Sequence, residues 1–335
     1  MFGCGRASNP RACNFGRQRH RLRNRFTPGY AVIQSRFSSM LSASFPRPAH
    51  HEGEVVQPAS QLNRVIWMLW LQGFDSAPEV VRVCLHSWKA RNPTWNVIEL
   101  SDENLPDYVD SDSLSALKNL DVKRQKLANL IRMYLISRHG GVWVDATCFC
   151  CQPLDKWLPS YMDSGFFGFR DPGPDRIVAN WFLAARKGNL LASTFYEKHR
   201  DFFLKHRFAR QTHKDRARVN RISTVLNRNA TLSQLWTYPV MTRTLKTYPY
   251  FIFHYHFARI VRENAACREI WNRTPSFSAR IPLKMSYAGL FSPMTPQLLN
   301  DLSQAKDPFY KLNWRYREES LTKGCILDHI MRSIT

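Results

Sequence analysis

The sequence lacks any long apolar run. The longest, residues 65–71, has seven residues, whereas a membrane-spanning helix needs roughly 18 to 20. Only 14 glycines and 19 prolines occur among 335 residues, which excludes collagen-like and low-complexity architectures. Apolar residues make up 44% of the chain and include 10 Trp, 12 Tyr and 21 Phe, enough to bury a large core. These features predict a soluble or peripheral globular protein.

Acidic residues and lysine are missing from the first fifty residues, which nonetheless contain nine arginines. This segment also has no apolar periodicity, so we expect residues 1–60 to be a disordered basic extension and residues 61–335 to be the folded domain. Its composition is typical of an organelle transit peptide, of an arm that binds nucleic acid or anionic membranes, or of a functionless extension upstream of the true start. The expected location is cytoplasmic or peripheral to a membrane, or an organelle if the extension is a transit peptide.

Acids are scarce in the whole chain, with 26 Asp and Glu against 48 Lys and Arg, a formal net charge of +22. Such a surface favours anionic partners. No RNA-recognition signature or helix-turn-helix spacing accompanies the charge, so we expect no specific nucleic acid. Residues 205–228 hold eight bases and one acid. They form either a solvated face or a patch for an anionic acceptor or the membrane that carries it.

Paired metal-binding cysteine motifs are also absent. Eight cysteines are spread over the chain, and the group in residues 148–151 has no second half with zinc-ligand spacing. We therefore expect reduced thiols that pack as small apolar residues in a strand.

The first ordered segment has the pattern of a βαβ unit. Residues 65–71 predict a buried strand, Pro78 and Glu79 open a helix with an apolar stripe, and residues 95–100 alternate as a second strand. Strand, helix and strand in this order indicate a parallel pair. The fold class is therefore α/β, with the functional site at the carboxyl ends of the strands.

The next helix is the clearest in the sequence. Apolar residues from Leu127 onward mark one face up to Arg138, and Gly140 stands where a left-handed cap belongs. Residues 142–147 then predict a strand that carries Asp145 near its end. A carboxylate there either lies at the mouth of a pocket, where it can hold a metal or metal-bound phosphates, or caps a turn.

Many of these residues resemble those of the capsular polysaccharide synthesis glycosyltransferases, relatives of the DXD-containing sugar-transfer proteins. The resemblance covers roughly residues 63–260 in the right order. The residues that carry it are Ile66, Trp67, Trp70, Gln72, Gly73, Ala77, Pro78, Cys84, Ser87, Trp88, Asn92 and Pro93, then residues 102–104, Arg132 and residues 140–147, then residues 180–185, Gly188, Asn189 and residues 250–255.

The resemblance implies a single GT-A-like (Rossmann-like) nucleotide-sugar-binding domain with a mixed, mainly parallel sheet, helical additions toward the C-terminus and a disordered N-terminal arm. It implies a glycosyltransferase of hexosyltransferase type. The enzyme would move a sugar from a nucleotide-sugar donor to a glycan or lipid-linked acceptor, with Mn²⁺ or Mg²⁺ on the diphosphate. A non-catalytic relative that binds nucleotide sugar or glycan is the alternative, and a basic nucleic-acid-binding protein is a weaker one.

Two departures from the resembled pattern motivate the non-catalytic alternative. Asn129 stands where the family commonly has Asp, which keeps an acceptor oxygen for a ribose or base hydroxyl but holds a cation less firmly. The sequence Asp145-Ala146-Thr147 also lacks the second carboxylate of the DXD motif, although this form fits the capsular branch.

The candidate catalytic residues are Asp145 and Arg132. Asp145 would face the metal, and Arg132 would lie near the nucleotide or orient the acid, unless it forms only an ion pair at the pocket wall, for instance with Asp145 itself. Gln72 and Gly73 would pass close to the base and ribose with Asn129, although Gly73 would equally suit a tight turn.

His254 or His256 would complete the metal site, and His254 is the candidate ligand. If residues 251–257 are extended, His254 and His256 share a face, and core packing of both imidazoles is the alternative.

Overall fold

The computed structural model describes residues 62–120, 122–206, 212–316 and 320–333. The chain divides into two units, Met1–Ser42 and Ala43–Thr335, and every described residue belongs to the second. The predictions for residues 1–60 therefore lie outside the described residues. None of the described helices is both long and apolar enough to span a membrane.

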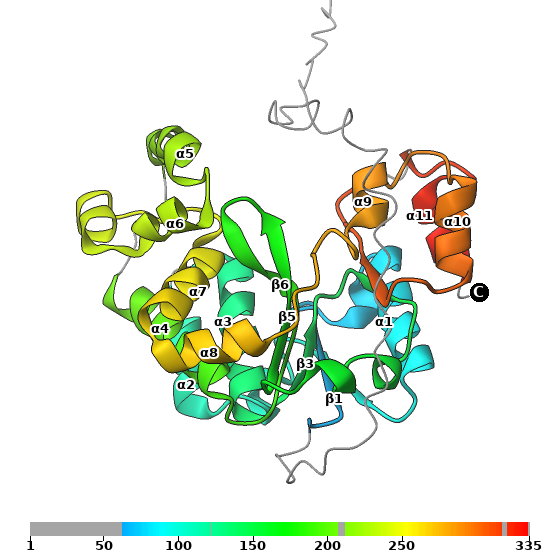
Figure 1. The fold of residues 1–335 in the computed structure, drawn as a ribbon, viewed down its shortest axis with the longest axis horizontal. Helices are drawn as coiled ribbons and strands as arrows, with labels where there is room; N and C mark the ends of the chain where they lie inside the picture. The colour runs from blue at the N-terminus through cyan, green and yellow to red at the C-terminus, as the bar shows by residue number, and fades with distance from the viewer. Residues whose placement is uncertain (1–61, 121, 207–211, 317–319, 334–335) are drawn as a thin grey trace, which may run out of the picture. The chain divides into compact units, whose positions relative to one another are not determined.

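The described part of the chain is an α/β fold built on a five-stranded sheet with the order β2-β1-β3-β6-β5 (Figure 1). The strands are β1 (Val65–Leu69), β2 (Asn96–Leu100), β3 (Gly141–Val144), β5 (Phe166–Gly173) and β6 (Arg176–Ala185). β1 pairs in parallel with β2 and β3, whereas β6 runs antiparallel to β3 and β5. The predicted α/β class with a mixed sheet is confirmed.

The predicted βαβ unit is present. Helix α1 (Glu79–Arg91) connects β1 to β2, and the two strands pair with Ile66 opposite Val97. α1 buries Val80, Val81 and Cys84 against the sheet. The chain then crosses β1 through α2 (Ser111–Lys118) and α3 (Arg124–Arg138) and enters β3 on the other side of β1.

Two glycines fix how α3 joins β3. Gly140 and Gly141 have φ angles of 73° and 92°, which side chains disfavour. A Cβ at Gly140 would lie 2.7 Å from the amide nitrogen of Lys187, and one at Gly141 would lie 2.6 Å from the carbonyl oxygen of Val65. Both glycines are therefore needed for β3 to approach β1 and the end of β6.

Alternation along β1 divides the core between the two faces of the sheet. Ile66 and Met68 pack with α1 in one apolar cluster, and Trp67 and Leu69 pack with α3 in the other. The α3 face also carries α4 (Leu190–Lys205), α7 (Ile252–Glu263) and α8 (Ala265–Arg273), as Figure 1 shows. The cysteines in β4 (Cys148–Cys150) are buried free thiols, as expected.

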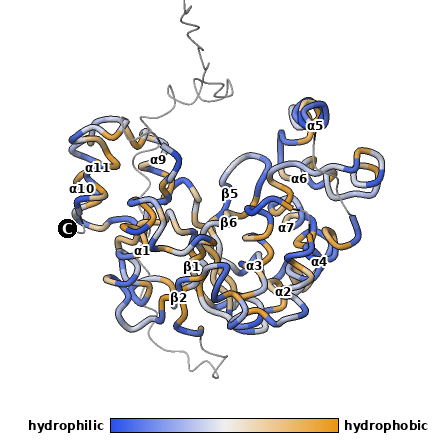
Figure 2. The backbone as a smooth tube through the Cα atoms, turned by 180° about the vertical axis from the view of Figure 1, so that it is seen from behind, coloured by the Kyte–Doolittle hydropathy of each residue, from blue (hydrophilic) through white to orange (hydrophobic). Residues whose placement is uncertain are grey.

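Helix α5 (His213–Leu226) contains much of the predicted basic segment. Val219 is its one buried residue, and the helix is mostly hydrophilic in Figure 2. Thr212 and Asp215 form a capping box at its start. The short α6 (Ala230–Ser233) follows, and then a π-helical turn over Val240–Thr244.

The expectation of an extended segment at residues 251–257 is wrong, because these residues begin helix α7. All residues from Ile252 to Ala258 are buried, so no polar face interrupts the aromatic run, and the run resembles a buried strand. Two residues apart on a helix means about 200° of rotation. His254 and His256 therefore lie on different faces.

The C-terminal segment packs on the α1 side of the sheet (Figure 1). It comprises α9 (Lys284–Ala288), α10 (Pro296–Ser303), β7 (Phe309–Lys311) and α11 (Ile326–Arg332). β7 pairs antiparallel with β4. The buried ammonium of Lys284 joins these elements, since it lies 3.0 Å from Asp301 and 2.7 Å from Asp307.

Candidate active site

A cavity of about 610 Å³ opens beyond the carboxyl ends of β1 and β3. The connection from β1 leads to β2 on one side, and the connection from β2 leads to β3 on the other side of β1. Ligands of open α/β sheets bind in the crevice at such a switch in strand order. Trp70 follows β1 and Asp145 follows β3 at the cavity. Helices α3 and α7, strand β6 and the segment after β7 supply the rest of the lining.

Asp145 supplies the carboxylate of this cavity. Its Oδ1 accepts hydrogen bonds from Arg132 Nη2 at 2.5 Å and from Trp143 Nε1 at 2.9 Å, and 28% of its side chain is exposed. Burial alone would raise the pKa of Asp145, but the charges of Arg132 and Lys311 lower it below the usual value. The carboxylate is therefore ionised at neutral pH and held in one orientation.

Arg132 lies deep behind Asp145, with 4% of its side chain exposed. It donates to Asn129 Oδ1 as well as to Asp145, and its guanidinium carbon lies 4.8 Å from the centre of the Trp143 ring. Burial lowers the pKa of Arg132 while Asp145 raises it, and an arginine in this setting keeps its charge. The ion pair with Asp145 that the sequence offered as an alternative is present, and it holds the carboxylate in place.

Asn129 sits one helical turn before Arg132 and is buried. Its Oδ1 also accepts from Asn180 Nδ2 at 3.1 Å. Asn180 belongs to a segment that carried the family resemblance, yet no sequence pattern assigned it a role.

His254 reaches the same cavity from α7. Its Nδ1 donates to the carbonyl oxygen of Val178 at 2.8 Å, which leaves Nε2 as the unprotonated nitrogen. Burial, together with Arg176, lowers the pKa of His254 well below its usual value. The imidazole is neutral and can accept a hydrogen bond.

The structure brings Asn129, Arg132, Asp145 and His254 together in one cavity but does not bring Gln72 and Gly73 there. Gln72 is exposed in the turn after β1. Gly73 has a φ of 83°, and a Cβ there would meet nothing within 4 Å. The backbone conformation of the turn accounts for this glycine.

Positive charge dominates the cavity wall. Asp145 is the one acidic residue in the described lining, against five basic residues. The basic residues are Lys126, Arg132, Arg176, Lys311 and Arg315. Sequence reasoning singled out Arg132 alone among these five.

Lys311 contacts the other end of the Asp145 motif, at Thr147. β7 lies beside β4 with Lys311 opposite Cys148, and this pairing brings Lys311 Nζ to 2.5 Å from Thr147 Oγ1 and 3.0 Å from the carbonyl oxygen of Leu312. Three-residue strands far apart in sequence leave no periodic signal. Nothing in the sequence pointed to this contact.

The side chains around Asp145 do not fit a divalent cation. Asp145 Oδ1 already accepts from an arginine and a tryptophan, and His254 can offer one nitrogen. The described residues contain no group of three or more His, Cys, Asp or Glu side chains arranged to hold a metal. Mg²⁺ and Mn²⁺ prefer several oxygen ligands. The Mn²⁺ or Mg²⁺ expected from the family resemblance stays a prediction.

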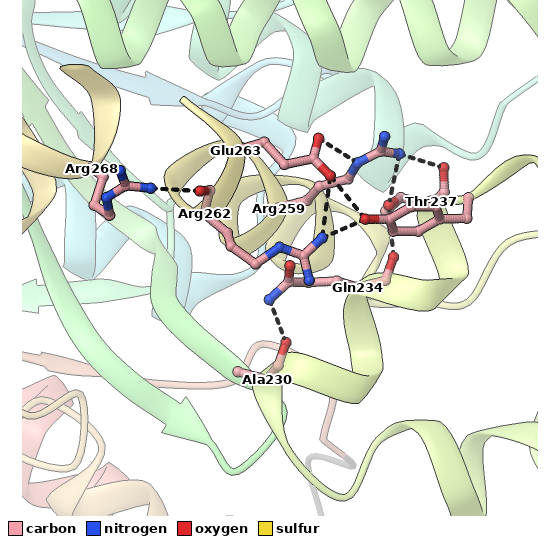
Figure 3. A network of polar contacts seen from close by, with 8 residues as sticks. Ala230, Gln234, Thr237, Arg259, Arg262, Glu263 and Arg268 are labelled. Carbon is pink, nitrogen blue, oxygen red and sulfur yellow. Dashed lines mark hydrogen bonds and ion pairs between the residues drawn. The ribbon is translucent and has the colours of Figure 1, made fainter. Parts of the chain in front are cut away.

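A second cavity, of about 670 Å³, lies on another face of α7. His256, Arg259 and Glu263 contribute to its lining. Figure 3 shows the polar network beside it, in which Glu263 accepts from Arg259 Nε at 2.9 Å and from Arg262 at 3.2 Å. Arg259 also donates to the carbonyl oxygen of Thr237 at 3.0 Å. One carboxylate is thus shared by two guanidinium groups.

The fold and the first cavity define an α/β protein with a basic ligand pocket at the switch point of its sheet. Comparison with known families then identifies it. Residues 11–211 match the family described as capsular polysaccharide synthesis protein, and the chain belongs to this family. The match begins within residues 1–60, which we expected to be an extension, and ends before residues 250–255 at the start of α7, which carry part of the resemblance.

Two curated relatives are similar over parts of their length. The O-glycosyltransferase braB of Annulohypoxylon truncatum is 27% identical over 143 residues, which cover 37% of this chain and 34% of the relative. The probable glycosyltransferase FCK3 of Fusarium pseudograminearum (strain CS3096) is 28% identical over 204 residues, which cover 54% and 50%. This chain thus spans half or less of the length of these relatives.

Among solved structures, the PaToxG glycosyltransferase is similar with a TM-score of 0.35 and 11% identity. The superposition covers 64% of this chain and 84% of that one.

Proposed function

We propose that the chain is a glycosyltransferase with a GT-A-type site, which transfers a hexose from a nucleotide-sugar donor to a hydroxyl group of a glycan or lipid-linked acceptor. The observation that carries the proposal is the cavity at the carboxyl ends of β1 and β3, with one fixed carboxylate among five bases. Membership of the capsular polysaccharide synthesis family and two relatives named as glycosyltransferases support it.

The chemistry of the reaction matches the charges of the cavity. The bond between the anomeric carbon and the phosphate oxygen breaks, and its electron pair leaves with the nucleoside diphosphate. The acceptor oxygen bonds to the anomeric carbon, and its proton is released. Negative charge thus grows on the diphosphate, and basic side chains fixed in a sheltered cavity stabilise it.

Asp145 has the opposite task in this proposal. The sugar passes through a state with positive charge on its ring, and an ionised carboxylate in a fixed position stabilises that charge. Arg132, Trp143 and Asn129 keep the carboxylate in place. His254 can accept a hydrogen bond from a hydroxyl of the donor or acceptor.

The acceptor is proposed to approach from the outer rim of the cavity. Exposed bases there include Arg315, and α5 carries further exposed arginines, so an anionic lipid-linked acceptor or membrane surface would be attracted. The expected increment is about 1 kcal/mol per basic residue near an anionic surface.

A panel of nucleoside diphosphate sugars tests the proposal. We expect one or more donors to raise the melting temperature of the protein and to release nucleoside diphosphate when an acceptor is present. Asp145→Asn should bind the donor but release little or no nucleoside diphosphate from it. Glu263→Gln, in the second cavity, should behave as the unmodified protein.

Two results would change the assignment. Stabilisation by a donor with no release under any condition would indicate the non-catalytic relative. Stabilisation by oligonucleotides alone would overturn both the glycosyltransferase hypothesis and that of a non-catalytic relative.

A further inference from the structure

The Asp145 motif has an ammonium group where the DXD pattern has a carboxylate. Residue 147, two positions after Asp145, is a buried threonine whose Oγ1 lies 2.5 Å from Lys311 Nζ. In the described part of the chain Lys311 forms no ion pair, and its second hydrogen bond is to the carbonyl oxygen of Leu312. A positive charge at this position repels a divalent cation and attracts a phosphate.

We infer that Lys311 binds the diphosphate of the donor in place of a divalent cation, so that donor binding and transfer need no metal. The inference rests on the proposed function for the identity of the donor. What it adds is the identity of the group, Lys311, that balances the negative charge of the diphosphate.

The surroundings of Lys311 suit this role. Thr147 Oγ1 and the carbonyl oxygen of Leu312 accept two of the three hydrogen bonds that an ammonium can donate, which leaves one donor for a ligand. The charge of Lys311 is felt at Asp145, whose pKa it helps to lower. Asp145 is in turn already bound by Arg132. The floor of the cavity therefore has two cations for one carboxylate.

The position of Lys311 is fixed by the fold as well. Leu312 N donates to the carbonyl oxygen of Thr147 at 2.7 Å, which extends the β4–β7 pairing by one residue. Behind β7, Lys284 binds the buried carboxylate of Asp307 at 2.7 Å. A charge held by strand pairing and a buried ion pair needs little reorganisation when charge develops on the leaving group.

The test measures binding of inorganic pyrophosphate to the full chain by titration calorimetry, in excess EDTA and again with Mg²⁺. We expect binding in EDTA and less than about threefold tightening by Mg²⁺. Lys311→Met should weaken binding in EDTA by about 10- to 100-fold, the usual effect of losing a hydrogen bond to a charged group. Lys311→Arg keeps the charge and should lose no more than a few-fold.

Lys198→Met is the matched control, because it removes one lysine from the lining of the second cavity. It should bind pyrophosphate as the unmodified protein does. If Lys311→Met lowers the melting temperature by several degrees, Lys311→Gln, which removes the charge and keeps a polar group beside Thr147, takes its place and should weaken binding to a similar extent.

Three outcomes overturn the inference: pyrophosphate binding that requires Mg²⁺, equal affinity of Lys311→Met and the unmodified protein, or sugar transfer that stops in EDTA. The last of these leaves the proposed function intact. Metal-free pyrophosphate binding that depends on Lys311, without release from any donor, would instead support the diphosphate site and refute the glycosyltransferase.

Discussion

The two cavities on α7 contain similar side chains and differ in how the charges are paired. In the second cavity Glu263 is shared by two arginines at a half-exposed surface, where ion pairs contribute about 0–1 kcal/mol. In the first, a buried arginine fixes Asp145, and Lys126 and Lys311 have no acidic partner among the described residues. The second cavity is lined by three bases (Lys198, Lys205 and Arg259) and two acids (Asp201 and Glu263), and the first by five bases and one acid. The larger excess of basic residues, rather than cavity size, favours an anionic ligand in the first cavity.

The largest effect should come from the carboxylate of the first cavity. Asp145→Asn removes one charge and little volume, so transfer should fall by about a hundredfold to a thousandfold, as when one fixed electrostatic group is lost from an active site. The measurement is the rate of nucleoside diphosphate release. Glu263→Gln is the counterpart in the second cavity, and an equal loss there would erase the distinction between the cavities.

Lys126 should affect stability strongly. It is 3% exposed and bonds to the carbonyl oxygen of Tyr250, and burial, with Lys123 adding to it, lowers its pKa from 10.5 to about 7. The unfolded chain therefore binds this proton more tightly than the folded one. The resulting cost to folding is full below about pH 7 and fades as the pH rises toward 10.5.

We thus expect Lys126→Met to stabilise the protein, by up to about 4 kcal/mol near pH 6 and much less near pH 10. Denaturant unfolding at the two pH values measures this. Lys198→Met, at an exposed position in the second cavity, should change stability by no more than about 0.5 kcal/mol at either pH. A gain for Lys126→Met that did not depend on pH would point to packing instead of charge.

Removing either partner of the Arg132–Asp145 pair should lower the free energy of unfolding, and the two losses should be unequal. The side chain of Arg132 is 4% exposed and that of Asp145 is 28% exposed. An unpaired charge is therefore more destabilising when Arg132 is the residue left behind. Asp145→Ala should therefore destabilise by about 3 kcal/mol or more and Arg132→Met by less. Arg132→Met should also raise the pKa of Asp145 and move the acid limb of the pH–rate profile to higher pH. The reverse order of stabilities would contradict the stated burial.

The smallest change expected is that of Asn129→Asp. The Oδ1 atom of Asn129 accepts from Arg132 and Asn180, and a carboxylate accepts the same bonds, so the fold should persist. The added negative charge should weaken pyrophosphate binding in EDTA by a few-fold. It should also make binding respond to Mg²⁺, because a second carboxylate then joins Asp145. Unchanged binding under both conditions would show that Asn129 lies outside the reach of the ligand.

The sequence predicted the elements whose signals are local. The βαβ start, helix α3, the cap at Gly140 and the placement of Asp145 after a strand all follow from periodicity and turn residues. These elements build one wall of the cavity, so half of the candidate site could be inferred before the structure. The family resemblance correctly identified the capsular polysaccharide synthesis family.

The remaining features depend on tertiary contacts. Helix α7 is buried on all sides over its first seven residues, which removes the polar face that would reveal a helix. Lys311 reaches Thr147 across 164 residues of sequence, through strands too short to show a pattern. The burial that lowers the pKa of Lys126 also comes from other segments, since Tyr248 and Tyr250 flank its ammonium.

The pairing of β4 with β7 has a consequence for the order of events during protein synthesis. β1 to β6 leave the ribosome well before β7, and the loop that Lys311 and Thr147 close spans 164 residues. Closing such a long loop is a late step in folding. A nascent chain can pair the strands of its sheet and place Asp145 before Lys311 reaches Thr147. Under the proposed function, donor binding and transfer would then await the C-terminal segment. A chain cut short before β7 would lack Lys311 and would expose Trp88 and Phe182, against which Phe309 packs, so we expect it to be inactive.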